Sequence, residues 1–232
     1  MLLGTAAGDA LGAGYEFGPP LPDDAPVTMR GGGGCNWAPG EWTDDTAMAI
    51  AIAEVAATGA DLRGVDAQDQ IVARWAGWSR TAPDVGIQTS QVLGSLMRTA
   101  PVALAYLDDP AGLAEAAMAV SALTHFDPSA GEACVLWSLA IRHAVLTGEL
   151  NPRVGLEYLP ADQRGVWADR LDAAERLRPS DFSNNGWVVE ALQAAWCAIA
   201  RTPYSLPGDD GPKIGVSQAD LIRLASEIAG CA

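Results

Sequence analysis

The residues best suited to chemistry form one short run, Trp42-Thr43-Asp44-Asp45-Thr46, between a glycine-rich stretch and an apolar run. Two adjacent carboxylates beside hydroxyl groups are the hard oxygen ligands that Mg²⁺ prefers. The same residue types also begin helices, because Thr or Asp caps the first turn and acids there complement the helix dipole. The run alone therefore indicates either a helix cap or a magnesium site, and both interpretations stay open at this point.

A second candidate region lies at the start of the chain. Small residues at Gly4, Gly8 and Gly12 share one helical face, which permits close packing of a helix against it. Asp9 stands in this apolar setting and needs a partner if it is buried. Glu16 follows at the expected helix end, where a solvated acid is the ordinary interpretation. The glycines do not form a phosphate loop, because their order does not match Gly-x-x-x-x-Gly-Lys and no strand precedes them.

Apolar residues at helical spacing dominate the chain that must position these groups. Few segments alternate with the period of two that a half-buried strand requires. We therefore expect an all-α fold, a single domain of crossing helices over residues 1–232. The expected helices span residues 45–57, 66–79, 111–123, 130–147, 161–177 and 187–201, with a short closing helix at about 218–229.

Two long connections interrupt the helical pattern. Residues 18–40 contain Gly31 to Gly34 and several prolines, and residues 202–217 are also rich in proline and glycine. Long irregular loops of this kind often carry function. The first of them leads directly into the Thr43–Asp45 run.

Composition excludes several classes of function. The net charge of −15 and the lack of a basic stripe exclude a nucleic-acid partner. The cysteines lie far apart without zinc spacing, and no uncharged stretch is long enough to span a bilayer. The N-terminus has no basic region before its apolar residues, so no signal peptide is expected. These features predict a cytoplasmic protein with reduced thiols and no membrane partner.

Taken together, the motifs resemble a known family. Gly8-Asp9-Ala10-Leu11-Gly12 with Glu16-Phe17, followed by Trp42–Thr46, is similar to the ADP-ribosylglycohydrolase family, of the dinitrogenase reductase-activating glycohydrolase type. The resemblance extends over roughly residues 1–203, and its motifs occur in family order. Later segments that contribute to it are 84–89, 94–101, 124–128 and 185–192.

The resemblance implies an all-α protein with two Mg²⁺ ions in a cleft. Such a protein hydrolyses the bond between ADP-ribose and an acceptor, on an ADP-ribosylated protein or small molecule. By motif, Thr43, Asp44 and Asp45 correspond to metal ligands, and Glu16 joins Asp44 and Asp45 as a catalytic candidate. The other positions that correspond to the ligand cleft are Asp9 in a supporting role, Gly94, Ser95, Met97, His125, Gly186 and Trp187.

Two departures from the family pattern concern the metal site and a cleft loop. The late Asp-x-Asp-Thr/Ser motif, which supplies further metal ligands, does not occur, and Asp209-Asp210 is typical of a solvated turn. Gln91-Val92-Leu93 precedes Gly94 where the family usually has Gly-Asn-Gly. We therefore expect one or two Mg²⁺ ions. The alternative is a catalytically impaired ADP-ribose-binding or structural relative with an incomplete metal site.

Overall fold

A computed structural model describes residues 1–16, 18–19, 21, 25–82, 95–178, 181–182 and 187–201 of the chain. Within these residues the secondary structure is helical, apart from one isolated antiparallel bridge between Gly32 and Trp37. The expected all-α fold is therefore confirmed for this part of the chain. The helices are α1 (Leu2–Ala13), α2 (Asp44–Ala56), α3 (Val65–Trp78), α5 (Ala100–Ala105), α6 (Pro110–Ala122), α7 (Pro128–Thr147), the 3₁₀ helix η1 (Pro152–Tyr158), α8 (Ala161–Arg176) and α9 (Val188–Arg201).

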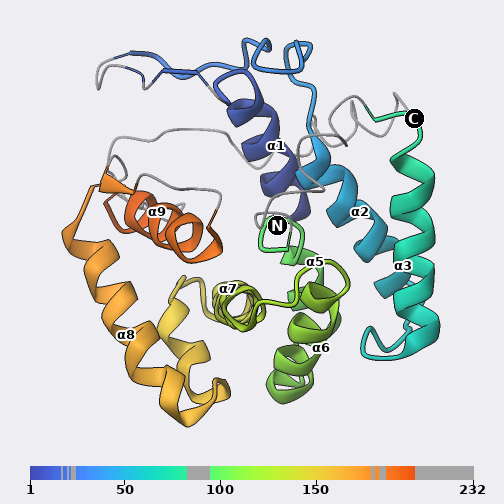
Figure 1. Cartoon of the computed structure of the whole chain (residues 1–232), viewed down its shortest axis with the longest axis vertical. Helices are drawn as coiled ribbons and strands as arrows, with labels where there is room; N and C mark the ends of the chain where they lie inside the picture. Colours follow the sequence, from blue (N-terminus) through green and yellow to red (C-terminus); the bar gives the residue numbers. More distant parts are fainter. Residues whose placement is uncertain are drawn as a thin grey trace.

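Helix α7 lies at the centre of the molecule and is seen end-on in Figure 1. Eleven of its 20 residues are buried, because helices α5, α6 and α9 and the 3₁₀ helix η1 all pack against it. Helix α1 lies beside α2, which in turn contacts α3 and α5. The central helix thus joins the half of the molecule that contains α1 and α2 to the half that contains α8 and α9.

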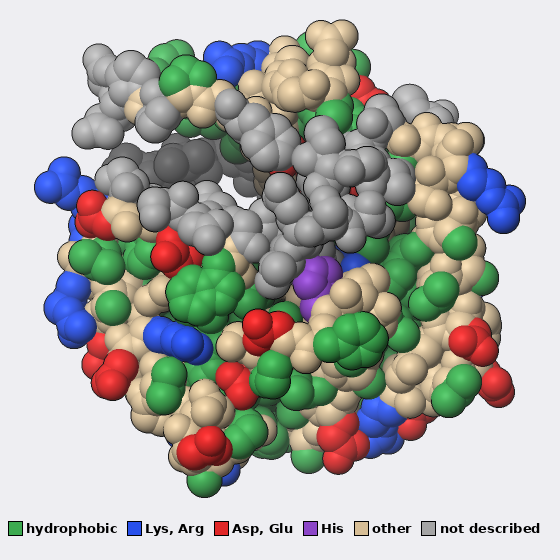
Figure 2. Space-filling model, viewed as in Figure 1, with side chains coloured by type: hydrophobic (Ala, Val, Ile, Leu, Met, Phe, Trp, Pro, Cys, Tyr) green, Lys and Arg blue, Asp and Glu red, His purple; other side chains and the backbone are tan. Residues whose placement is uncertain are grey.

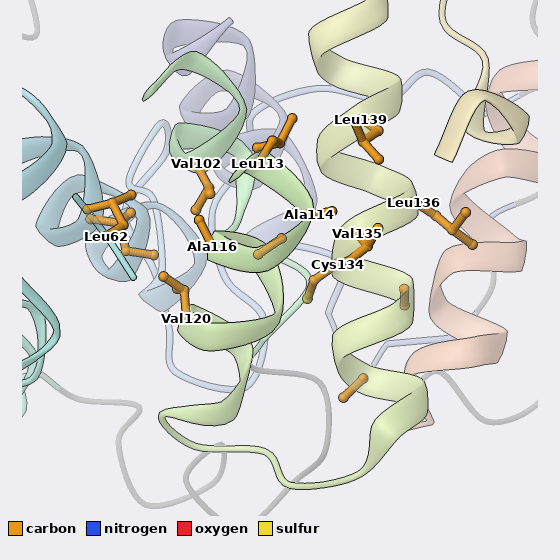
Figure 3. Close-up of a cluster of buried hydrophobic side chains, with 14 of the residues drawn as sticks. Leu62, Val102, Leu113, Ala114, Ala116, Val120, Cys134, Val135, Leu136 and Leu139 are labelled. Atoms are coloured by element: carbon orange, nitrogen blue, oxygen red, sulfur yellow. The ribbon is translucent and has the colours of Figure 1, made fainter. Parts of the chain in front are cut away.

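The core consists mainly of small and branched apolar side chains. Figure 3 shows Leu113 and Val120 on α6 and Cys134 and Leu136 on the neighbouring α7, with Leu136 pointing away from α6; all four are fully buried. Alanines such as Ala116 on the same faces let the two helix backbones approach closely. The nearly all-round apolar character of these segments in the sequence follows from their central position.

Side-chain caps, prolines and a glycine define the ends of α6 and α7. Asp109 caps α6 by accepting a hydrogen bond from the Gly112 N–H at 2.8 Å, and Asp127 caps α7 in the same way from Ser129 at 2.8 Å. A proline follows each cap at the first helical position, where its missing N–H costs nothing. Gly148, with φ of 83°, ends α7 in the left-handed conformation.

The small-residue face of α1 does not pack against a described helix. The face of α1 formed by Gly4, Gly8 and Gly12 is exposed, and no described residue lies within 4 Å of a Cβ placed on any of them. Instead of holding a neighbouring helix, this face lines a cleft. The small residues leave space there, and α1 buries mainly Ala6, Ala10 and Ala13 on other faces.

The described surface is of mixed character. On the face drawn in Figure 2, acidic and basic side chains are dispersed among apolar ones and do not gather into a basic stripe. No helix in the described ranges is both long enough and apolar enough to cross a membrane. Cytoplasmic location stays a prediction. The expected closing helix at about 218–229 and the loop 202–217 lie outside the described residues.

Candidate functional site

The site begins where α1 meets the N-terminus of α2. The Asp9 carboxylate on α1 accepts hydrogen bonds from the Thr43 N–H at 3.0 Å and the Thr43 hydroxyl at 2.8 Å. It also accepts from the Thr46 N–H at 3.0 Å and the Thr46 hydroxyl at 2.6 Å. Thr43 is the N-cap residue of α2, but its own side chain makes no capping bond. Asp9 therefore caps α2 from a different helix.

This arrangement fixes the direction of the Thr43 hydroxyl. Because its proton points to Asp9, the lone pairs of Oγ1 are directed elsewhere and can act only as acceptors or ligands. A hydroxyl oriented in this way suits a hard cation or a sugar hydroxyl.

The two acids that follow Thr43 have different surroundings. Asp44 is only 2% exposed, whereas Asp45 is half-buried and lines the same cleft as Asp9. Successive residues on a helix differ in direction by about 100°. One of two adjacent carboxylates can therefore point into the interior while the other points toward the cleft.

Arg98 provides a buried positive charge near Asp44. It is 1% exposed, its guanidinium lies 4.1 Å from the centre of the Trp75 ring, and it donates to the Thr124 hydroxyl at 2.6 Å. Burial lowers the pKa of Arg98 to about 10, and the nearby Asp44 charge opposes this shift. Even so, the side chain is charged at neutral pH and compensates the buried Asp44 carboxylate.

The sequence indicated Arg98 only as part of the segment 94–101. An arginine among apolar residues needs a partner, which is a signal for burial, but it does not name the partner. The hydrogen bond to Thr124 also connects Arg98 to His125, whose Nδ1 lies 2.6 Å from the Thr124 hydroxyl.

A cleft of about 1080 Å³ lies over this junction. Residues of α1, α2, α7 and α9 form its wall, including Trp137 and Ile141 of α7, which the sequence did not indicate as site residues. Its volume is that of a small-molecule site, which is roughly 300–1,000 Å³. The cleft brings together five of the residues predicted from the sequence: Asp9, Glu16, Thr43, Asp45 and Met97.

The other predicted site residues lie elsewhere. Ser95 is fully buried next to the Cys134 thiol, and burial raises the pKa of that thiol. His125 is half-buried, Trp187 is 39% exposed, and neither lines the cleft among the described residues. Gly94 and Gly186 lie outside the described residues. The ligand-binding roles of all these positions stay predictions.

The glycine-rich segment is attached to the end of α1. A Cβ on Gly33 would overlap the Ala13 carbonyl oxygen, and one on Gly14 would overlap that of Gly31, so the two backbones are in direct contact. Gly31, Gly32 and Gly33 all have positive φ, which favours glycine. The segment then pairs Gly32 with Trp37 through two 2.8 Å backbone hydrogen bonds and continues to Thr43.

A second hollow, of about 460 Å³, lies on the other side of Thr43. Its wall includes three tryptophans and one acid, and Thr43 is the residue that it shares with the large cleft. The residues of this wall are Trp37, Gly40, Glu41, Trp42, Thr43, Ala47, Trp78, Thr81 and Ala82.

The donor atoms fit a hard cation in kind but are few. Thr43 and Asp45 line the cleft, whereas Asp44 is buried and is not among its lining residues. The described residues contain no group of three or more His, Cys, Asp or Glu side chains that could hold a metal ion. They therefore provide only the first part of the ligand set that the resemblance implies.

Comparison with known proteins defines the class. A model of the ADP-ribosylglycohydrolase family matches residues 1–219. The chain therefore belongs to this family. A solved structure described as an ADP-ribosylglycohydrolase-related protein complex is 30% identical and superposes with a TM-score of 0.62, covering 86% of this chain and 74% of that chain.

Two curated relatives are particular members of the class. The chain is 30% identical to the ADP-ribosyl-[dinitrogen reductase] glycohydrolase of Rhodospirillum rubrum, over 62% of this chain and 56% of that protein. It is 24% identical to the ADP-ribosylarginine hydrolase Tri1 of Serratia proteamaculans, over 87% of this chain and 61% of that protein. It thus spans about three fifths of the length of these relatives.

Proposed function

We propose that the chain is an ADP-ribosyl-acceptor hydrolase that uses Mg²⁺ in the large cleft. The observation that supports this proposal best is the convergence of Asp9, Glu16, Thr43 and Asp45 on one cleft of nucleotide size. The names of the relatives support the same reaction class, with arginine on a protein as the acceptor to assay first.

The reaction needs stabilisation of positive charge at the anomeric carbon and a nucleophilic water. Thr43, Asp44 and Asp45 would hold Mg²⁺, which when bound orients ribose hydroxyls and lowers the pKa of a bound water. Glu16 lines the cleft and is the candidate general base that takes the proton of the attacking water. Asp9 accepts the proton of the Thr43 hydroxyl, which would leave the lone pairs of that oxygen available to the ligand.

Charge sets one requirement on this proposal. The chain has 29 acidic and 14 basic residues, and the pyrophosphate of ADP-ribose is negative as well. A bound cation would offset this repulsion locally. We therefore expect ADP-ribose to bind more tightly with Mg²⁺ present than with a chelator.

The decisive experiment removes both acids of the motif. Asp44→Ala with Asp45→Ala should abolish Mg²⁺-dependent release of ADP-ribose from an arginine-ADP-ribosylated peptide. The matched control is Asp162→Ala with Asp169→Ala, two exposed acids of α8. Circular dichroism must show that both variants are folded, because Asp44→Ala also removes the negative charge that compensates Arg98. Full activity in the Asp44/Asp45 variant would refute the metal assignment.

A second candidate function is binding of ADP-ribose without turnover. The small number of metal-ligand groups among the described residues favours it. Calorimetry would then show ADP-ribose binding to the wild-type chain while no acceptor is released with Mg²⁺ supplied. Absence of binding would exclude this candidate.

A further inference from the structure

The second hollow has the composition of a site for an organic cation. Three tryptophans, Trp37, Trp42 and Trp78, and one acid, Glu41, are among its lining residues, and none of its described wall residues is Lys or Arg. Aromatic rings attract cations through their π faces, and a nearby carboxylate adds charge. A neutral or anionic ligand would gain from neither.

Local structure holds Glu41 in position. Ala38-Pro39-Gly40-Glu41 is a tight turn in which the Glu41 N–H donates to the Ala38 carbonyl oxygen at 3.0 Å, and Gly40 has φ of 84°. Proline followed by a glycine with positive φ is the signature of a type II turn. Glu41 Oε2 accepts from the Ala38 N–H at 2.7 Å. No hydrogen bond from a described residue reaches Oε1, so that oxygen is left for a ligand.

The tryptophans are positioned by different elements. Trp37 is 7% exposed and is fixed by its backbone pairing with Gly32, whereas Trp78 is the last residue of α3. Trp42 comes directly before the Thr43 cap of α2. The hollow thus lies between α2, α3 and the loop that contains Trp37 and Glu41.

The position of the hollow relates it to the cleft. Thr43 contributes to both walls, so both spaces border the N-terminus of α2. A group joined to a sugar that contacts Thr43 and Asp45 would extend past Thr43 toward Glu41 and Trp78. The positive end of the α2 dipole does not oppose a cation here, because Asp9, Asp44 and Asp45 offset it.

We propose that the hollow bounded by Trp37, Glu41, Trp42 and Trp78 binds the guanidinium group of an arginine side chain. A guanidinium is planar, stacks on aromatic rings, is weakly hydrated and donates paired hydrogen bonds to a carboxylate. Its role as the acceptor subsite rests on the proposed hydrolase function, but binding of the cation itself does not.

The test compares two probes of equal shape and different charge. N-acetyl-L-arginine amide and N-acetyl-L-citrulline amide are titrated into the full chain, and tryptophan fluorescence reports binding. The arginine probe should bind about tenfold more tightly than the citrulline probe. Equal affinities, or no binding of the arginine probe, would overturn the proposal without any variant being needed.

Variants then locate the site. Glu41→Gln should reduce the preference for arginine to about threefold or less, and Trp78→Ala should weaken binding of the arginine probe. Glu149→Gln, an exposed acid beyond the end of α7, should keep the wild-type preference. An unchanged preference in Glu41→Gln, with a wild-type melting curve, would contradict the assignment.

Measurements of turnover distinguish binding of a guanidinium group from a role of the hollow as the acceptor subsite. If the wild type releases ADP-ribose from an arginine-linked peptide, Glu41→Gln should raise KM for that peptide while ADP-ribose affinity stays the same. An unchanged KM would refute the acceptor role. If the wild type releases no ADP-ribose, the hydrolase function fails, while the comparison of the two probes still decides whether the guanidinium site exists.

Discussion

At the scale of single residues, Asp9 links structure and chemistry most directly. Its carboxylate accepts hydrogen bonds from two N–H groups and two hydroxyls at the start of α2, so all of these partners are donors. An asparagine in this position would keep one oxygen but would turn an NH₂ group toward donors. The geometry of the Thr43 hydroxyl therefore depends on a side chain 34 residues away in sequence.

Asp9→Asn should accordingly reduce stability. We expect a loss of about 1–3 kcal/mol in the free energy of unfolding, because buried donors lose their acceptor and α2 loses its cap. Urea denaturation followed by circular dichroism measures it. Asp69→Asn, an exposed acid within α3, is the control and should change the midpoint little. Equal midpoints for Asp9→Asn and the wild type would disprove the capping role.

Asp61 should influence stability at acid pH. Hydrogen bonds from Arg63 and from the Tyr106 hydroxyl hold the pKa of this carboxyl well below its usual value of 3.8. Burial raises the pKa of Tyr106 to about 12, so its hydroxyl remains a donor to Asp61 at neutral pH. Because the folded state favours ionised Asp61, its contribution is present above pH 3.8 and is lost as pH falls through the lowered pKa.

The variant Asp61→Asn tests this dependence. Its melting temperature should be lower than that of the wild type at pH 7, and the difference should shrink as the pH is lowered below about 4. Thermal melts from pH 7 to pH 2 measure the two curves, with Asp66→Asn at the exposed start of α3 as the control. Curves that stay parallel over this range would exclude the linkage.

The sequence predicted part of the site, and the limit has a physical cause. Consecutive residues such as Thr43 and Asp45 form a motif whose chemistry follows from spacing, and they do line the cleft. The burial of Asp44 beside Arg98, and the grouping of Trp37 with Trp78, depend on how distant elements pack. No local pattern encodes those distances, so sequence reasoning could not place them.

At the scale of elements, the long helices were predictable because each has a sustained apolar face and a recognisable end. The expected helix 130–147 corresponds to α7 at Pro128–Thr147, and 66–79 corresponds to α3 at Val65–Trp78. The short elements α5 and η1 were not predicted. They are only six and seven residues long, so a helical period is not visible in their sequences. Both pack against α7, and this packing stabilises them.

The glycine-rich segment permits a test of the contact between loop and helix. Gly32 and Gly33 both have positive φ, so replacement by alanine strains either position. Only at Gly33 would the new Cβ also overlap the Ala13 carbonyl oxygen, whereas nothing described lies within 4 Å of one at Gly32.

Gly33→Ala should therefore destabilise the chain by about 1–3 kcal/mol, and Gly32→Ala by about 1 kcal/mol. Denaturant titration of the two variants measures the difference, which isolates the packing of the loop on α1. Since the loop leads to Trp37, Gly33→Ala should also change the tryptophan emission spectrum more than Gly32→Ala does. Equal effects of the two substitutions would show that the backbone contact contributes nothing.

At the scale of the whole molecule, the helices contribute unequally to the buried core and to the open cleft. Helix α7 and its neighbours form the core, whereas α1 contributes few buried side chains and presents glycines to the cleft. Glycine within a helix costs about 0.5–1 kcal/mol relative to alanine. Glycine on an exposed helix face therefore costs stability, and under the proposed function the space that it leaves for a ligand compensates for this cost.

Replacement of Gly8 tests this separation with two substitutions at one position. Gly8→Ala should stabilise the chain by about 0.5–1 kcal/mol and leave most of the cleft open. Gly8→Trp should also keep the fold, since no described residue lies within 4 Å of the new Cβ, but its ring would occupy the space above Asp9 and Thr43. Calorimetry with ADP-ribose and Mg²⁺ should then show binding to Gly8→Ala and at least about a tenfold weaker affinity for Gly8→Trp. Undiminished affinity in a folded Gly8→Trp chain would mean that ADP-ribose binds outside this cleft, and the proposed site would have to be abandoned.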